Sequence, residues 1–319
     1  MYRFIFIKRV VNKINSYFCT KFITIMKRYL IALILTCFWI TTMQAQLLWE
    51  ISGNRLKQKS YLFATHHLVP VTVLDSIPGV YKAFNQSKCV IGEIVVNDPM
   101  MLNKIAEAAQ LPNFIAITDL LLPAEYHIVD SALQAVTQLK LSALERLKPA
   151  MISNIYLMSL YNRAYPTENQ NWQLDSFFQQ IAEQKEIPII GLETIEKQID
   201  LLFNSLSLER QSFLLIGAIK STQEIEDEIK TINNLYKKGD LNALLSLYQN
   251  DTTKYAATQQ EQFELLDNRN HEWSKKIPQL IHQKPCFIAV GALHLPGENG
   301  LITLLRKAGY RVKPVKNNR

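Results

Sequence analysis

The sequence predicts an α/β protein with a central mixed sheet flanked by helices and a helical insert at about residues 99–185. Short apolar runs bounded by turn residues are typical of buried strands, and they lie near both ends and in the middle of the chain. Between them, apolar residues recur at spacings of three and four, which indicates amphipathic helices. The C-terminal part of the chain has a strand–helix–strand pattern, and we expect both of its strands to join the sheet.

The first two strands are expected to form a hairpin. Apolar runs at 47–51 and 60–64 flank a Ser-Gly-Asn segment, in which glycine and asparagine favour a turn. A helix with proline in its first turn is expected over 78–86. A buried strand that carries Glu93 is expected over 88–96.

The next part of the chain is mostly helical. Leucine, isoleucine and methionine recur at helical spacing over 99–165, and the polar stretch 162–173 is expected to be a loop. The amphipathic helix expected over 174–185 leads into a strand at 187–192. Thr194 is expected to cap the first of several helices that follow.

The C-terminal part is a compact unit of two strands and a helix. An apolar strand is expected over 287–290, a helix over 301–308 and a last strand over 310–315. Gly309 is expected to end the helix, because glycine readily adopts the left-handed conformation found after helices.

The net charge of +7 belongs to the N-terminal segment. Residues 1–45 hold seven lysines or arginines and no acidic residue, so the rest of the chain has 28 basic and 28 acidic residues. A neutral body gives no basic surface, and we expect no nucleic-acid partner.

The basic segment also resembles a secretory leader. Lys27-Arg28, an apolar run over 29–40 and a small residue at Ala45 are the parts of a signal peptide over 26–45. We expect residues 1–25 to be an upstream extension and 46–319 to be the mature domain. The apolar run is shorter than the ~20 residues that span a membrane. The protein is therefore expected to be periplasmic or secreted, without a stable membrane span; a retained anchor is the alternative.

Only two cysteines follow the expected cleavage site, and two are too few for a disulfide scaffold. Cys89 and Cys286 both lie in apolar, strand-like runs. We expect buried thiols, or one disulfide if the two strands are neighbours.

Two stretches of similar form place a histidine just past an expected strand. They are Ala-Thr-His-His at 64–67 and Gly-Ala-Leu-His at 291–294. In α/β folds, ligands bind outside the carboxyl ends of the strands. His67 and His294 are therefore expected in one site built from both ends of the chain.

Two glutamates, Glu93 and Glu193, stand at or near the ends of other expected strands. Imidazole and carboxylate groups suit Zn²⁺, Mn²⁺ or Co²⁺, and two histidines with one carboxylate leave positions open for a hydrolytic water. A second carboxylate suits a general base. The alternative is structural: hydrogen-bonded histidines and helix-capping glutamates.

In order along the chain, these motifs resemble the TraB/GumN family, also called the Tiki-like family. The resemblance covers nearly all of residues 47–315, although the helical region matches only loosely. The segments that carry it are 48–53, 60–68, 90–93, 190–198, 267–270 and 290–312.

The resemblance implies a metal-dependent hydrolase fold, whose animal relatives act as Mn²⁺- or Co²⁺-requiring proteases on secreted ligands. It implies a peptidase with a peptide or protein substrate, and the leader over 26–45 predicts that it acts outside the cytoplasm. The implied ligands of the divalent ion are His67, Glu93 and His294. The implied catalytic residues are Glu93, Glu193, Arg269 and Asn270.

Ala64 departs from the family pattern, which has glycine there. If that glycine has a positive φ, alanine costs about 1 kcal/mol or shifts the backbone. If the glycine allows a close approach, alanine narrows the site. The alternative function is therefore a non-catalytic protein that binds a peptide or small ligand on the same fold.

Further polar residues have alternatives of their own. Arg269 lies on an expected helix, where it either holds an oxyanion or forms a surface salt bridge. Strand alternation turns His66 to the face opposite His67, which favours a structural role. Asp175 and Gln198 are weaker site candidates. Three histidines are expected to be solvated: His127, His271 and His282.

Overall fold

The computed structural model describes residues 46–166 and 173–315, which belong to one unit of the chain. The expected signal peptide, the upstream extension and half of the loop expected over 162–173 (residues 167–172) lie outside the described residues. Among those that are described, no helix combines the length and apolar character that a membrane crossing requires.

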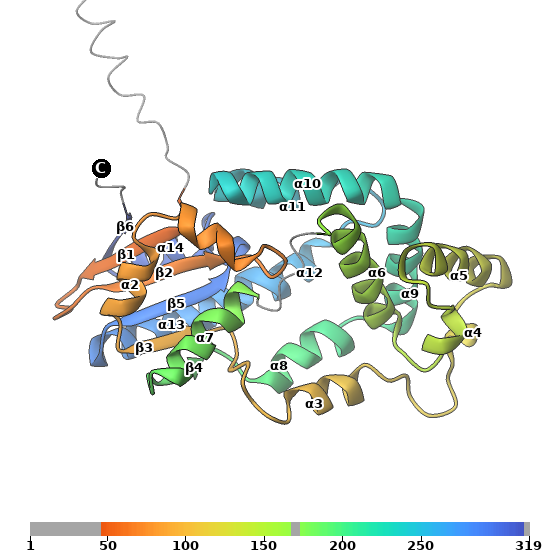
Figure 1. Ribbon diagram of the computed structural model, residues 1–319, viewed down its shortest axis with the longest axis horizontal. Helices are drawn as coiled ribbons and strands as arrows, with labels where there is room; N and C mark the ends of the chain where they lie inside the picture. The colour runs from red at the N-terminus through yellow and green to blue at the C-terminus, as the bar shows by residue number, and fades with distance from the viewer. Residues whose placement is uncertain (1–45, 167–172, 316–319) are drawn as a thin grey trace, which may run out of the picture. The chain divides into compact units, whose positions relative to one another are not determined.

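A six-stranded sheet runs in the order β4-β3-β5-β2-β1-β6 (Figure 1). The strands are β1 Leu48–Gly53, β2 Ser60–Thr65, β3 Cys89–Gly92, β4 Ile189–Gly191, β5 Cys286–Gly291 and β6 Tyr310–Pro314. Strands β4, β3, β5 and β2 pair in parallel, whereas β1 is antiparallel to both β2 and β6. The predicted mixed sheet is confirmed.

This topology gathers four strand ends at one edge of the sheet. Thr65 pairs with Gly291 across β2 and β5, and Gly92 pairs with Gly191 across β3 and β4. Because neighbouring parallel strands end together, the residues that follow them are close in space although they lie up to 227 positions apart in the sequence.

Helices are numerous and lie mainly between β3 and β5. They are η1 Val71–Ser76, α2 Val80–Gln86, α3 Met101–Ala108, α4 Ile117–Leu120, α5 Pro123–Thr137, η2 Leu141–Leu144, α6 Pro149–Ala164, α7 Leu174–Gln184, α8 Ile195–Ile199, η3 Asp200–Asn204, α9 Leu208–Lys220, α10 Thr222–Lys238, α11 Leu241–Gln249, α12 Gln259–Gln262, η4 Phe263–Asp267, α13 Asn268–Gln283, η5 Ala292–His294 and α14 Leu301–Lys307.

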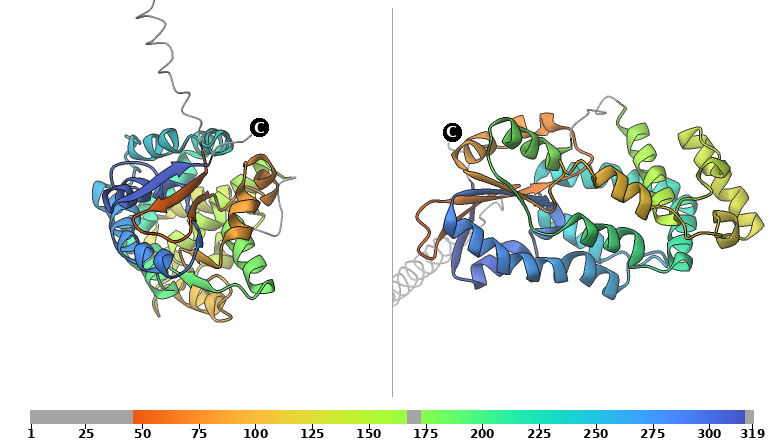
Figure 2. Two further views of the ribbon diagram at one scale, coloured as in Figure 1. Left: turned by 90° about the vertical axis from the view of Figure 1, so that its left-hand side faces the viewer. Right: turned by 90° about the horizontal axis from the view of Figure 1, so that it is seen from below.

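Helices cover both faces of the sheet, with α2 and α7 on one face and α13 and α14 on the other (Figures 1 and 2). On the first face, Phe178 of α7 packs against Phe63 and Phe287 at ring distances of 5.5 and 4.6 Å, and Phe84 of α2 completes the group. Burial of these four rings removes a large apolar area from water, which holds both helices on the sheet.

A second apolar cluster is separate from the sheet and is built mainly by α5, α6 and α9. Leu133, Tyr156 and Leu215 are completely or almost completely buried in it. The expected insert over 99–185 contributes α5 and α6, whereas α9 comes from the segment after β4. The last helix of that range, α7, packs on the sheet instead.

Strand β3 ends earlier than the sequence pattern indicates. The amide of Gln179 on α7 donates to the carbonyl of Ile94 at 2.9 Å and accepts from the backbone N–H of Val96 at 3.0 Å. These bonds replace a strand partner, so the chain leaves the sheet after Gly92. Glu93 therefore follows the strand rather than lying in it.

Cys89 and Cys286 are direct partners across β3 and β5. Both are buried free thiols in the structure. The expectation of buried thiols is confirmed; although the two strands are neighbours, the alternative of a disulfide is not what the structure shows.

Candidate active site

The candidate site begins at the ends of the parallel strands. Glu93 directly follows β3, and Glu193 lies two residues after β4. The backbone N–H of Glu193 donates to the carbonyl of Glu93 at 2.9 Å, just past the ends of the two strands, and holds the two glutamates side by side. His294 comes from the short helix η5 that follows β5.

Arg269, near the start of α13, joins these groups. Its Nη2 lies 2.5 Å from Glu93 Oε2 and 2.6 Å from Glu193 Oε1, and its Nε donates to Glu193 Oε2 at 3.2 Å. Its Nη1 lies 3.0 Å from His294 Nε2. The guanidinium sits over Trp273, 4.6 Å from the ring centre. Only 6% of Arg269 is exposed, so the surface salt bridge considered for this residue is wrong.

Neighbouring groups determine the tautomer of His294. Asn270 Nδ2 donates to the carbonyl of Asn299 at 2.9 Å, so its Oδ1 faces His294 Nδ1 at 2.8 Å. An amide oxygen only accepts, and therefore Nδ1 carries the proton and Nε2 carries the lone pair. Burial lowers the pKa of His294 to about 4, with Arg269 and His67 acting in the same direction against Glu93. The imidazole is therefore neutral at pH 7.

Glu93 is held ionised by its surroundings. Burial would raise its pKa, but the charges of His294, Arg269 and His67 and the N–H of Gly291 together lower the pKa to about 2. Above pH 4, where His294 is neutral, Arg269 is the cation in direct contact that maintains this effect. The Gly291 N–H donates to Oε1 at 2.8 Å, and the same oxygen lies 3.8 Å from His294 Nε2.

His67 belongs to an adjoining group at the end of β2. Its Nδ1 forms an ion pair with Asp175 Oδ2 at 2.7 Å, and Thr65 donates to Asp175 Oδ1. The charge of Asp175 raises the pKa of His67 to about 9. Since 62% of the His67 side chain is exposed, solvent screens this pair.

The structure thus brings Glu93, Glu193, Arg269, Asn270 and His294 into direct contact. His67 acts on this cluster through its charge, while its contact within the described residues is to Asp175. The weaker candidates both lie at the site: Asp175 holds His67, and Gln198 donates to Glu93 Oε2 at 3.2 Å and to Glu193 Oε1 at 3.4 Å.

The structure excludes helix capping by Glu193 and backbone strain at Ala64. Glu193 does not cap α8, because the hydroxyl of Thr194 accepts from the N–H of Lys197. Ala64 lies within β2 and is absent from the residues with positive φ, so a strained backbone is excluded there. Its carbonyl accepts from Tyr236 Oη at 2.9 Å.

The remaining histidines lie outside the cluster. The Nδ1 of His66 accepts from the N–H of Leu68, and its ring lies 5.2 Å from that of Tyr236, which is a structural role. The side chains expected to be solvated are indeed exposed: His127, His271 and His282.

Two site residues, Trp273 and Asn299, were missed from the sequence. The Trp273 ring contacts the Arg269 guanidinium and the His294 ring, the latter at 4.4 Å between ring centres. A signal existed for it, because it lies four residues after Arg269 on the same helix face. Asn299 lies in an irregular loop, where no periodic pattern marks it.

The donor chemistry fits a divalent cation. His294 Nε2 and Glu93 Oε1 are 3.8 Å apart, a separation that two ligands about 2.0–2.2 Å from one ion can have. With His294 neutral, two carboxylates outnumber the guanidinium, so the cluster is net negative. In residues 46–166 and 173–315, however, no three His, Cys, Asp or Glu side chains are placed to hold a metal ion together.

Comparison with known proteins adds family information. Residues 47–314 match the model of the TraB/PrgY/gumN family. The chain is 25% identical to "Metalloprotease TIKI2" of Danio rerio and 25% identical to "Metalloprotease TIKI1" of Homo sapiens, over 83% of this chain in both cases. It covers 60% and 61% of these relatives, less than two thirds of their length. No solved structure matches the chain.

Proposed function

The chain belongs to the TraB/PrgY/gumN family, and we propose that it is a metal-dependent hydrolase that cleaves peptide bonds outside the cytoplasm. The observation that carries the proposal is the buried cluster at the strand ends, where a neutral histidine offers a lone pair beside ionised Glu93. The metalloprotease names of the relatives support the same reaction class.

We assign the ion to His294 Nε2 and Glu93, with His67 as the third ligand from the neighbouring strand end. A bound Mn²⁺, Co²⁺ or Zn²⁺ ion would polarise the peptide carbonyl and lower the pKa of a water molecule. Asn270 holds the His294 tautomer that such binding needs, because it occupies the Nδ1 proton. Asp175 accepts from Nδ1 of His67, which leaves Nε2 for the ion; because the pKa of His67 is raised to about 9, binding there has to displace the Nε2 proton.

The two glutamates have different roles in this proposal. A carboxylate with a pKa of about 2 is a poor proton acceptor near neutral pH, so Glu93 suits a ligand better than a general base. Glu193 is then the candidate base. Arg269 has to release His294 Nε2 for metal binding, and it is then placed to stabilise negative charge that develops on the carbonyl oxygen.

The test combines metal analysis with a peptide-library cleavage assay on the purified mature chain, with each metal added in turn. We expect His294→Ala to lose metal and activity together, and Glu193→Gln to keep the metal and lose roughly 10²–10⁴ in rate. His282→Ala is the matched control, since this histidine is exposed and bonds Tyr310. Full metal stoichiometry in His294→Ala would overturn the ligand assignment. N-terminal sequencing of the mature protein tests the location, which requires cleavage after Ala45.

A second candidate function is a binding protein without catalysis. One observation favours it: Arg269 already bonds His294 Nε2, Glu93 and Glu193, so the cluster is fully paired without a ligand. Wild-type protein that binds a peptide but cleaves none with any of the three metals would select this alternative.

A further inference from the structure

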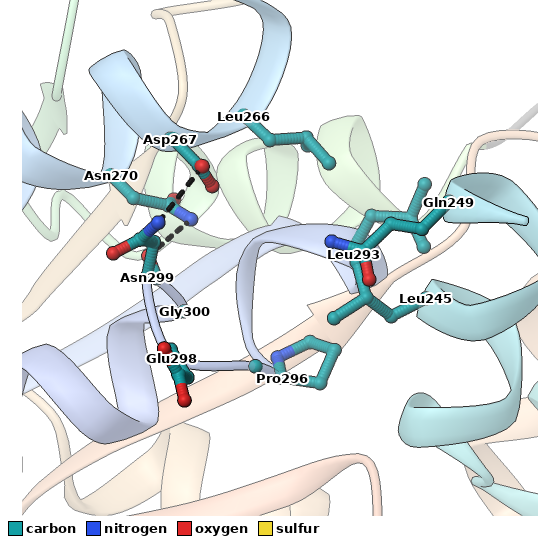
Figure 3. A pocket seen from close by; sticks show the side chains of 11 residues that line it. Leu245, Gln249, Leu266, Asp267, Asn270, Leu293, Pro296, Glu298, Asn299 and Gly300 are labelled. Carbon is teal, nitrogen blue, oxygen red and sulfur yellow. Dashed lines mark hydrogen bonds between the residues drawn. The ribbon is translucent and has the colours of Figure 1, made fainter. Parts of the chain in front are cut away.

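A cavity of about 370 Å³ lies beside the candidate site and shares Asn270 and Asn299 with it. Asn270, which bonds His294 Nδ1, lies in its wall (Figure 3). The other walls come from α11, from η4 and from the loop that follows η5. Its volume lies in the range of small-molecule sites in proteins.

One side of the cavity is mainly apolar. Leu245 and Leu293 lie across from the polar groups in Figure 3, and Leu266 and Pro296 extend this surface. The loop is packed closely against α11 here, because a Cβ atom on Gly297 would lie only 2.7 Å from Leu245 Cδ2. Gly297 also has a φ of +89°, which favours glycine. The apolar wall therefore has a defined shape that suits an aliphatic chain.

The opposite side is polar and carries two carboxylates, Asp267 and Glu298. Asp267 Oδ2 accepts from Asn299 Nδ2 at 2.9 Å, and among the described residues no donor reaches Asp267 Oδ1. Glu298 adds a second carboxylate and Asn299 a side-chain oxygen, whereas Gln249 lies beside Leu245 and Leu293 in Figure 3. No lysine, arginine or histidine is among the described residues that line the cavity. Its occupant should therefore supply positive charge and several donors.

We propose that this cavity binds an ammonium or guanidinium group on an aliphatic stem, as lysine and arginine side chains carry. The stem lies along Leu245 and Leu293, and the cationic end is bound by Asp267 and Glu298. Charge-assisted hydrogen bonds to these carboxylates account for selectivity over neutral ligands of the same shape.

Hydrogen bonds connect the cavity to the candidate site. Asp267 bonds the side chain of Asn299, the Asn299 carbonyl bonds Asn270, and Asn270 bonds His294. The cavity thus serves as a specificity pocket for basic residues in a peptide substrate, and this role rests on the proposed hydrolase function. Binding of the cation itself does not depend on hydrolysis.

Isothermal titration calorimetry on the metal-free protein separates the two proposals. The probes are Nα-acetyl-lysine methylamide and Nα-acetyl-arginine methylamide, with the norleucine analogue as the neutral match. We expect the basic probes to bind at least tenfold more tightly than the norleucine analogue, and added salt to weaken them. Equal binding of the three probes, or no binding, would overturn the proposal whether or not the protein hydrolyses peptides.

Variants of the two carboxylates locate the binding. Asp267→Asn and Glu298→Gln preserve side-chain size, and each should weaken the basic probes, with about tenfold expected for Asp267 because it is partly shielded from solvent. Asp227→Asn, an exposed carboxylate on α10 paired with Lys230, is the control and should change nothing. Unchanged affinity in both cavity variants, with circular dichroism showing a native fold, would contradict the assignment.

Comparing the affinities of a free diamine and of the amino-acid amides distinguishes a free amine from a peptide side chain as the ligand. If 1,5-diaminopentane binds as tightly as the lysine probe, a free amine is the ligand. If the acetylated amino-acid amides bind more tightly, a peptide side chain is the ligand, and cleavage of library peptides should then favour those with lysine or arginine.

Discussion

Replacing Arg269 by methionine should destabilise the protein far more than the same change at an exposed arginine. The variant leaves two buried carboxylates, Glu93 and Glu193, side by side without their cation; their side chains are 11% and 2% exposed. Removing one partner of a buried ion pair costs about 3–5 kcal/mol, because the remaining charge stays desolvated. We expect a loss of this size in the free energy of unfolding at pH 7.

The loss of stability in Arg269→Met should depend on pH in one direction. In the wild type, the lowered pKa of Glu93 contributes stability above pH 4.5 that is lost as the pH falls toward 2. Without Arg269, burial and the neighbouring carboxylate raise the Glu93 pKa instead, so the folded variant binds a proton more readily than the unfolded chain. The difference between variant and wild type should therefore shrink as the pH falls from 7 to 4.

Urea unfolding followed by circular dichroism measures both effects. The control is Arg163→Met, which removes an arginine that is 47% exposed and donates to Glu226 through Nε and Nη2. An exposed pair contributes at most about 1 kcal/mol. The reasoning would be refuted if Arg269→Met lost no more stability than Arg163→Met, or if its loss grew on acidification.

Three further predictions concern the strands and strand ends at the site. Burial lowers the pKa of His294 to about 4, so the contribution of the neutral imidazole to stability is full above pH 6.5 and is lost as the pH falls toward 4. Over this interval, the free energy of unfolding of the metal-free wild type should fall by up to about 3 kcal/mol more than that of His294→Gln, as measured by urea titration. A Cβ atom on residue 291 would lie 3.1 Å from Glu93 Oε1, so Gly291→Ala should displace the carboxylate and cost about 1–3 kcal/mol. Ala64→Gly should cost about 1 kcal/mol, since it loosens an unstrained buried strand; higher hydrolysis by this variant would show that the Ala64 methyl narrows the site.

The sequence predicted the sheet and the strand-end residues because their signals are local. Apolar runs that stop at a glycine mark β3 and β5, and parallel pairing then brings Glu93 and His294 to one edge. The early end of β3 had no local signal, because it depends on the amide of Gln179, which lies 83 residues from Val96.

The pairing of His67 with Asp175 also had no local signal in the sequence. Asp175 lies 108 positions further along the chain, and it is aligned with His67 by the packing of Phe178 on the sheet one helical turn later. The amphipathic pattern of α7 predicts a helix with one apolar face but does not tell which of the two apolar clusters that face meets. The same ambiguity explains why the boundaries expected for the helical insert include a helix that covers the sheet.

The burial of Arg269 and its pairing with carboxylates could have been predicted from the sequence. Trp273, Ile277 and Ile281 form a buried stripe at four-residue spacing on α13, and Arg269 continues that stripe by one more turn. A charged residue in line with a buried stripe needs partners of opposite charge, because an unpaired buried guanidinium is too costly. The glutamates at the ends of the buried parallel strands are the carboxylates that such a helix can meet when it packs on the sheet. An arginine at the start of an apolar helical stripe therefore indicates a buried carboxylate site, even before the two strand-end histidines are considered.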